Sequence, residues 1–459
     1  MIHDLKPYPA YKDFGVLWLG DVPEHWEIRR LKQVCRFAYG DSLPTEIRQQ
    51  GEIAVFGSNG RVGFHSTANT HTPCIVIGRK GSFGKVNFST DPVFAIDTTF
   101  FIDDRFTKAN LHWLYYLLGW LRLDEVSKDS AVPGLHREDA YQRIVAYPTD
   151  SDEQSAIVHY IDYIDRQIRR YIRAKQKLIK LLEEQKQAII HQAVTRGLDP
   201  DVRLKPSGVE WLGDVPEHWE VLRLKSLVTE AVAGPYGSSL TKEMYTRQGY
   251  RVYGQQQVIP DDFTIGDYYI SAEQFSQMQR YRVFTGDVLV SVMGTVGRVA
   301  VVPENAEPGI INPRLVRYRP DTTRVKSRYL QLAMQGTTSQ VQLREAAKGT
   351  TMEGLNMQIL GKLVLAIPPL NEQDTILNEW HTKSEVLVFT ENNVRSEISL
   401  LREYRTRLIA DVVTGKLDVR EAVANLPEEI DETEVLDEGL VEDEETTEED
   451  LDREPEEET

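Results

Sequence analysis

The chain has 459 residues, 41% of them hydrophobic, and this length predicts about three domains with packed cores. Its two cysteines, Cys35 and Cys74, have no CxxC pair and no histidine cluster near them. This pattern excludes a disulfide framework and a zinc site and favours a reducing compartment. The sequence shows no signal-like N-terminus and no apolar run of membrane-spanning length, so we expect a cytoplasmic protein that contacts no membrane.

The net charge of −18 comes from the C-terminal end. Residues 428–459 hold 19 Asp and Glu against one basic residue, Arg453, which leaves 52 acidic and 52 basic residues elsewhere. Because this segment has few large apolar residues, we expect an acidic disordered tail. A neutral body neither indicates nor excludes a nucleic-acid binder, since a local basic patch can lie on a balanced surface.

Two parts of the chain repeat one another. Residues 18–32 read WLGDVPEHWEIRRLK and residues 211–225 read WLGDVPEHWEVLRLK, and the first ten letters are identical. The further matched pairs, in the same order, are 76–86 with 289–299, 130–135 (SAVPGL) with 350–355 (TTMEGL), and 194–199 (VTRGLD) with 413–418 (VTGKLD). The chain is therefore an internal duplication with similar edges and different middles.

Each repeat begins with a compact module, residues 1–150 in the first and 199–370 in the second. Short β-like runs such as 74–77 and 288–292 are punctuated by Gly, Asn and Pro, and a short helix is predicted at 111–121 and at 327–334. We therefore predict two α+β domains. Pro148 and the pair Pro368–Pro369 indicate where each module passes into a long helix, because a proline restricts the residue before it.

The long helices are predicted at residues 151–198 and 371–418, each roughly 60 Å long at 1.5 Å per residue. The first shows a heptad seam of Ile157, Ile161, Ile164, Ile168, Tyr171, Lys175, Leu178, Leu182, Gln185 and Ile189. The second shows a looser seam of Ile376, Trp380, Leu387, Val394, Ile398, Leu401, Leu408 and Val412. Isolated core helices are rarely this long, so we predict an antiparallel coiled coil within a pseudo-twofold repeat.

Catalytic signatures are missing from the sequence. GSFGK at residues 81–85 lacks the spacing of a phosphate-binding loop, and a tight turn between strands is the better interpretation. Asn312–Pro313 is followed by Arg314, so the Asn-Pro-Pro-aromatic signature of adenine methylation is absent. His25 and His218 share the same EHW context and are each expected to make a local hydrogen bond. The repeated tryptophans, Trp18 with Trp26 and Trp211 with Trp219, are expected to be core anchors.

Polar residues suited to contacting bases or phosphates cluster in the loops of both modules. In the first module these are Ser58, Asn59, Arg61, Arg79, Lys80, Ser82 and Lys85. In the second they are Tyr253, Gln255, Gln256, Gln257, Thr295, Arg298, Asn312, Arg314, Lys348 and Thr350. Arg and Lys pair with guanine or phosphate, and Asn and Gln pair with adenine. No catalytic residue and no metal ligand is predicted.

The duplicated WLGDVPEHWE, the SAVPGL and TTMEGL boxes, and the helices ending in VTRGLD and VTGKLD resemble the specificity subunit of type I restriction–modification systems, over residues 1 to 420. The resemblance implies two target-recognition domains held apart by an antiparallel helix pair, each reading half of a bipartite double-stranded DNA target. Residues 81–85 and 294–298 resemble the family's glycine-turn box, and 348–351 a later box of which 129–131 is a degenerate copy.

The resemblance also implies partners. Modification subunits would supply an adenine methyltransferase with S-adenosylmethionine, and restriction subunits would supply ATP- and Mg-dependent translocation and cleavage, so this chain is expected to bind no cofactor and to be no enzyme. The different middles imply an asymmetric target. For the acidic tail two hypotheses stay open, competition with DNA for the basic loops and simple solubilisation.

Two other interpretations belong to different classes of protein. A coiled-coil adaptor without a DNA role would explain the helices but not two loop-rich modules with divergent middles. A self-sufficient restriction or methylation enzyme would need the catalytic motifs that the sequence lacks.

Overall fold

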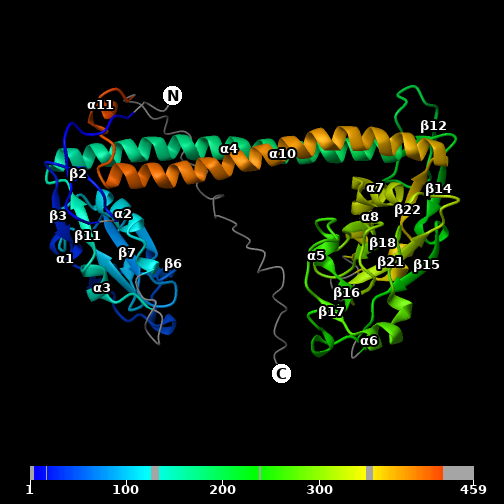
Figure 1. Ribbon diagram of the computed structural model, residues 1–459, viewed down its shortest axis with the longest axis horizontal. Helices are drawn as coiled ribbons and strands as arrows, with labels where there is room; N and C mark the ends of the chain where they lie inside the picture. The colour runs from blue at the N-terminus through cyan, green and yellow to red at the C-terminus, as the bar shows by residue number, and fades with distance from the viewer. Residues whose placement is uncertain (1–4, 17, 126–133, 237–238, 348–354, 427–459) are drawn as a thin grey trace. The chain divides into compact units, whose positions relative to one another are not determined.

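The computed structural model describes residues 5–16, 18–125, 134–236, 239–347 and 355–426. The chain divides into two compact units, one of residues 1–171 with 400–459 and one of residues 172–399. Each unit holds one α+β module and part of both long helices, α4 (Ser151–Thr195) and α10 (Leu370–Val413) (Figure 1). The predicted acidic tail lies outside the described residues.

The first unit contains a four-stranded antiparallel sheet in the order β4-β10-β7-β8. A second sheet has the order β6-β5-β9, in which β5 and β9 are parallel. Buried apolar side chains fill the interior strands, since β7 reads CIVIG and is buried along its whole length. The bounds are β1 (Tyr11–Lys12), β2 (Val22–Pro23), β3 (Glu27–Arg30), α1 (Leu31–Val34), β4 (Ala38–Tyr39), β5 (Ile53–Gly57), β6 (Gly60–His65), β7 (Cys74–Gly78), β8 (Val86–Ser89), β9 (Phe94–Ala95), β10 (Thr99–Ile102), α2 (Leu111–Trp120), α3 (Arg137–Tyr141), β11 (Ile144–Tyr147) and α11 (Arg420–Val423).

The second unit repeats this topology. Its four-stranded sheet has the order β15-β21-β18-β19, and its second sheet the order β17-β16-β20, with β16 and β20 parallel. The bounds are β12 (Leu204–Pro206), β13 (Asp214–Pro216), β14 (Glu220–Arg223), β15 (Val228–Ala233), β16 (Tyr250–Tyr253), α5 (Gln255–Val258), β17 (Tyr269–Ile270), α6 (Ala272–Gln277), β18 (Val288–Ser291), β19 (Val299–Val301), β20 (Gly309–Ile311), β21 (Leu315–Pro320), α7 (Ser327–Gln335), α8 (Thr337–Ala347), α9 (Met357–Gly361) and β22 (Val364–Ile367). The predicted repeat of two α+β domains is confirmed, as are the short helices, which are α2 and α7.

The start of each long helix is fastened to the repeated EHW segment. His25 Nε2 lies 3.0 Å from Glu153 Oε2, and His218 Nε2 lies 2.7 Å from Glu372 Oε2. Both glutamates are in the first turn of their helix, where a carboxylate is also favoured by the helix dipole. The predicted local hydrogen bonds of the two histidines are therefore confirmed.

The prediction that all four repeated tryptophans are core anchors is half wrong. Trp26 and Trp219 are fully buried, but Trp18 and Trp211 are 50% and 51% exposed. The difference follows from position, because the exposed pair precedes a glycine with positive φ, Gly20 or Gly213, in the turn leading into the repeated strand. Trp18 packs on Trp120 with 5.6 Å between ring centroids.

The long helices run antiparallel and pair within each unit (Figure 1). In the second unit Lys175 Nζ lies 2.5 Å from Glu397 Oε2, and Arg395 Nη2 lies 3.7 Å from Glu183 Oε1, so the pairing order is reversed along the two helices. In the first unit Arg405 donates to Asp165. The predicted antiparallel coiled coil is confirmed.

The predicted seam of α4 is buried in its first half and only partly buried in its second. Ile157, Ile161, Ile164 and Ile168 are buried, but Tyr171 and Leu178 are 58% and 37% exposed and Gln185 is exposed. Lys175, Leu182 and Ile189 of the predicted seam are half-buried, as are Ile172 and Ile179 beside it. The seam of α10 is confirmed, since all eight positions are buried or half-buried. Within the described ranges, none of the helices has the length and apolar composition needed to cross a bilayer.

Candidate nucleic-acid interface

A glycine turn joins two antiparallel strands in each module, β7 to β8 and β18 to β19. Gly81 and Gly84 have φ of 71° and 79°, and Gly294 and Gly297 have φ of 61° and 77°, values that favour glycine. The hydrogen bonds correspond: Gly84 N donates to Gly78 O and Gly297 N to Ser291 O, both at 2.8 Å. This confirms a tight turn in place of a phosphate-binding loop. Its exposed predicted residues are Lys80, Ser82, Lys85, Thr295 and Arg298.

The segment after the middle strand of the second sheet contacts this turn in both modules. In the first it is a hairpin tip, where Lys85 Nζ donates to Asn59 O and Oδ1 at 3.0 and 3.1 Å, and Ser58 Oγ donates to Thr98 O at 2.7 Å. In the second it is helix α5, where Gln255 Nε2 donates to Met293 O. The structure therefore brings together residues that are distant in sequence, and it does so at equivalent places.

A third loop completes each candidate interface. Arg79 N donates to Thr98 O and Val292 N to Arg314 O, both at 2.9 Å, so the residues before β10 and β21 lie against the glycine turn. Asn312 Oδ1 accepts from Arg314 N at 3.0 Å and shapes the second of these loops. Such an arrangement of exposed hydroxyl, amide and cationic groups on rigid turns can form hydrogen bonds and ion pairs with a polyanion.

The leucines that end SAVPGL and TTMEGL, Leu135 and Leu355, contact the residue before each glycine turn. Leu135 N donates to Arg79 O at 2.9 Å, and Leu355 N donates to Val292 O at 2.8 Å. Both leucine side chains are buried, which explains why leucine ends both boxes. The predicted contacts Lys348 and Thr350 lie outside the described residues, as does the degenerate copy at 129–131.

Two of the predicted contact residues are core residues, which corrects the prediction for them. Tyr253 is fully buried, its hydroxyl donates to Glu307 O at 2.7 Å, and burial raises its pKa to about 12. Gln257 is fully buried and accepts from Gly254 N at 2.8 Å. Strand alternation and the α5 turn point them inward, which a list of polar residue types could not reveal. Gln255, Gln256 and Arg314 are half-buried, and Arg61 is exposed over the Phe64 ring.

Sequence reasoning missed the glycines that allow the frame to close. A Cβ on Gly40 would lie 2.1 Å from Ile96 O, and one on Gly234 would lie 1.9 Å from Asn312 O. Gly40 N donates to Thr99 O and Gly234 N donates to Leu315 O, which are in the first residues of the neighbouring strands β10 and β21. The two strand ends share no sequence signal beyond the glycine itself, because Gly40 follows Tyr39 and Gly234 follows Ala233. Tyr39 and Arg137 were not among the predicted contact residues either.

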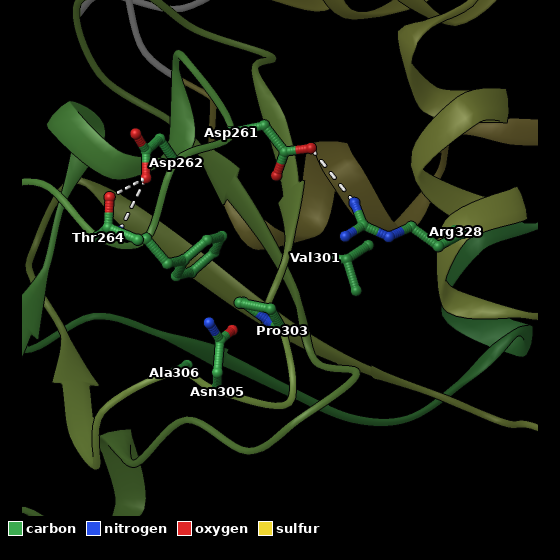
Figure 2. Close-up of a pocket in the computed structure, with 9 residues that line it drawn as sticks. Asp261, Asp262, Thr264, Val301, Pro303, Asn305, Ala306 and Arg328 are labelled. Carbon is green, nitrogen blue, oxygen red and sulfur yellow. Dashed lines mark hydrogen bonds and ion pairs between the residues drawn. The ribbon is translucent and has the colours of Figure 1, made fainter. Parts of the chain in front are cut away.

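A hollow of about 210 Å³ in the second unit is lined by residues 261–264 and by Val301, Pro303, Asn305, Ala306 and Arg328, none of which is a predicted contact residue (Figure 2). Arg328 reaches Asp261 at 3.3 Å, and Thr264 Oγ1 donates to Asp262 at 2.7 Å. In the first unit His71, Asp103 and Asp104 lie close enough to share a metal ion. Asp103 is fully buried there and accepts from Arg105 Nε at 3.0 Å and from His71 N at 2.9 Å, so its oxygens already serve the protein.

The family model described as "Type I restriction modification DNA specificity domain" matches residues 23–181 and 216–382. The chain belongs to this family. It is 20% identical over 350 residues to the type I restriction enzyme EcoBI specificity subunit of Escherichia coli, over 75% of this chain and 73% of that protein. It is 24% identical over 170 residues to the putative type I restriction enzyme MjaX specificity subunit of Methanocaldococcus jannaschii, over 36% of this chain and 39% of that one.

A solved structure shares the fold. A chain from a study of complex assembly and conformational transition of the type I restriction–modification system aligns over 86% of this chain and 99% of its own length, with a TM-score of 0.62 and 14% identity. The specificity domain thus occurs twice here, and each copy contains one of the glycine-turn interfaces.

Proposed function

We propose that this chain is the non-catalytic DNA-recognition subunit of a type I restriction–modification complex, in which each module reads one half of a bipartite, asymmetric target. The observation that carries the proposal is the repeated frame: the same backbone hydrogen bonds support Ser58, Asn59 and Lys85 in one module and Gln255, Thr295 and Arg298 in the other. A constant frame with different exposed side chains is what two different half-sites require.

The side chains fit the chemistry of base edges and phosphates. Lysine and arginine pair with guanine O6 and N7 or with phosphate, and asparagine and glutamine pair with adenine. Contacts with bases would supply the specificity, and contacts with phosphates would supply position and much of the affinity. The two sets share few residue types, so the two half-sites are expected to differ.

In this proposal the long helices set the gap between half-sites and dock modification subunits. Half-sites about one helical turn apart would offer the same face of the DNA to both modules. Catalysis would come from partners, with S-adenosylmethionine on the modification subunits and ATP and magnesium on restriction subunits. The names of the relatives, which are specificity subunits of type I restriction enzymes, support this assignment.

The first test is a methylome. The full chain is co-expressed with its modification subunit in a host that lacks adenine methylation, and modified adenines are mapped across the genome. We expect one asymmetric motif with a fixed unspecified gap. A stable complex that adds no methylation would overturn the proposal and favour the coiled-coil adaptor.

Substitutions in the two glycine turns then test which module reads which half of the target. Lys85→Ala should relax or weaken the half read by the first module only, and Arg298→Ala the other half only, each by about 1–3 kcal/mol if the contact is with a base. Lys32→Ala, an exposed lysine of α1 away from the turn, is the matched control and should leave both halves intact. Effects of one variant on both halves would contradict the division of labour.

A further inference from the structure

One cluster in the first unit has two guanidinium groups against one exposed aromatic ring. The Cζ atoms of Arg79 and Arg137 lie 5.0 and 5.2 Å from the ring centroid of Tyr39, which is 50% exposed. Arg79 directly follows β7, and Arg137 is the first residue of α3. The face of an aromatic ring attracts a guanidinium group, and stacking on the ring leaves the in-plane N–H groups available for hydrogen bonds.

The charges of this cluster are only partly compensated. Arg137 Nε lies 3.5 Å from Glu138 Oε1, a carboxylate on a side chain that is 74% exposed, and such pairs are weak. Arg79 Nη1 donates to the main-chain oxygen of Asp97 at 3.0 Å, and within the described ranges no carboxylate forms an ion pair with it. Exposed Lys80 is the next residue along the turn. The cluster therefore suits an anion.

The second module has no such cluster at the equivalent positions. Its own exposed ring with two guanidinium groups is Phe284, which lies 4.9 Å from Arg282 Cζ and 4.4 Å from Arg319 Cζ, but Arg319 is paired with Asp287 and Glu230. Gly40 N donates to Thr99 O and Gly234 N to Leu315 O, so Tyr39 corresponds to Ala233. The bonds from Leu135 N to Arg79 O and from Leu355 N to Val292 O match Arg79 with Val292, and two residues further on they match Arg137 with Met357. All three positions are apolar there, so the frame does not need the cluster.

We propose that Tyr39, Arg79 and Arg137 form a phosphate clamp that holds the DNA backbone beside the half-site read by the first module, with no counterpart at the equivalent positions of the second. The inference rests on the proposed function, because the clamp adjoins the glycine turn assigned to reading. It predicts unequal anchoring of the DNA, because the first module adds two charge-assisted phosphate contacts at positions where the second module has apolar residues.

The test uses the full chain with its modification subunit and a duplex carrying the methylome motif. Binding is measured against salt concentration for the wild type and for Arg79→Gln/Arg137→Gln. Each lost phosphate contact lowers the slope of log K against log salt by about 0.9. We therefore expect the double variant to lose roughly 1.8 from this slope, about a tenfold smaller fall in affinity between 50 and 200 mM salt, with an unchanged methylation motif.

A matched control comes from the same unit. Arg29 also stacks on a tyrosine, with its Cζ 4.2 Å from the Tyr147 ring, but its Nη2 pairs with Glu27 at 2.7 Å. Arg29→Gln should leave the salt slope unchanged. Arg79→Lys/Arg137→Lys should keep most of the slope, because the salt dependence reports the positive charges that contact phosphates and lysine keeps those charges.

A second variant guards against misfolding. Tyr39→Ala/Arg79→Val/Arg137→Met carries the residues that the second module already accommodates in the same frame, and it should melt as the wild type does and lose the same slope. Replacing single phosphates beside the first half-site by neutral methylphosphonates should weaken the wild type and leave this variant unaffected.

An unchanged slope in both variants would show that the cluster is surface packing only, and a changed motif in the first half would show that it reads bases; either overturns the clamp. If the wild-type complex binds the motif no better than a scrambled duplex, the proposed function itself fails, which is a distinguishable result.

Discussion

The two modules have the same strand order, the same parallel pair and the same turn hydrogen bonds, yet their interiors are stabilised differently. In the first, Cys74 and Phe101 belong to an apolar cluster. In the second, the corresponding positions are Asp287 and Arg317, which are 1% and 2% exposed and lie 3.1 Å apart. The shared backbone frame therefore tolerates either an apolar or an ionic interior. What the two modules keep in common is the close backbone contact at Gly40 and Gly234 and the junction with the long helices.

The ionic interior of the second module offers the largest expected effect. Asp287→Ala leaves the Arg317 guanidinium buried with one half-exposed partner, Glu230, so we expect a loss of about 3–5 kcal/mol. Hydrogen exchange of the β18 and β21 amides measures it. Cys74→Ala in the first module should cost much less, and Asp287→Cys/Arg317→Phe, which copies the first module, should recover most of the loss. Equal losses for Cys74→Ala and Asp287→Ala would contradict the comparison.

The shared frame is tested at its closest backbone approach. Gly40→Ala and Gly234→Ala should each destabilise their own module by about 2–3 kcal/mol, because the added Cβ meets a carbonyl oxygen. Gly119, an exposed helical glycine whose Cβ would meet nothing within 4 Å, is the control, and Gly119→Ala should stabilise by up to about 1 kcal/mol. Urea unfolding followed by circular dichroism distinguishes the three variants.

The helix junctions differ in one hydrogen bond. Trp219 Nε1 donates to Glu372 Oε1 at 3.0 Å, whereas Trp26 Nε1 has no acceptor among the described residues. Both rings are fully buried, so Trp219→Phe and Trp26→Phe remove similar apolar area. Trp219→Phe should lower the free energy of unfolding more than Trp26→Phe does, by about 1.5–3 kcal/mol, because a hydrogen bond to a charged acceptor contributes about that much. Equal losses of unfolding free energy in the two variants would show that the bond adds nothing.

Acid should act on the first module through Asp103, and this is the smallest expected effect. Burial opposes ionisation, but hydrogen bonds from Arg105 and from His71 N outweigh it and hold the pKa of Asp103 below its usual value. The stability it adds is present above the unfolded pKa and is lost as pH falls through the lower folded pKa. Asp103→Asn should therefore flatten the acid limb of a stability–pH profile, and an unchanged limb would exclude this carboxylate as a cause.

The sequence by itself determined the duplication, the α+β modules, the antiparallel helix pair and the glycine turns. Each of these follows from a local signal: a repeated phrase, a three-and-four spacing of apolar residues, or glycines where φ must be positive. The residues of the turns, such as Lys85 and Arg298, could be proposed for the same reason, because a turn between strands exposes its tip.

Only the tertiary structure decided which side chains meet. Tyr253 and Gln257 are polar in the sequence but face a core formed by strands distant along the chain. Tyr39, Arg79 and Arg137 meet because β4, the end of β7 and α3 converge around one sheet. Tyr171 and Leu178 of the α4 seam are exposed although their spacing matches that of the buried isoleucines before them. Side-chain direction and long-range contact depend on packing between elements, and no spacing along the chain encodes that geometry directly.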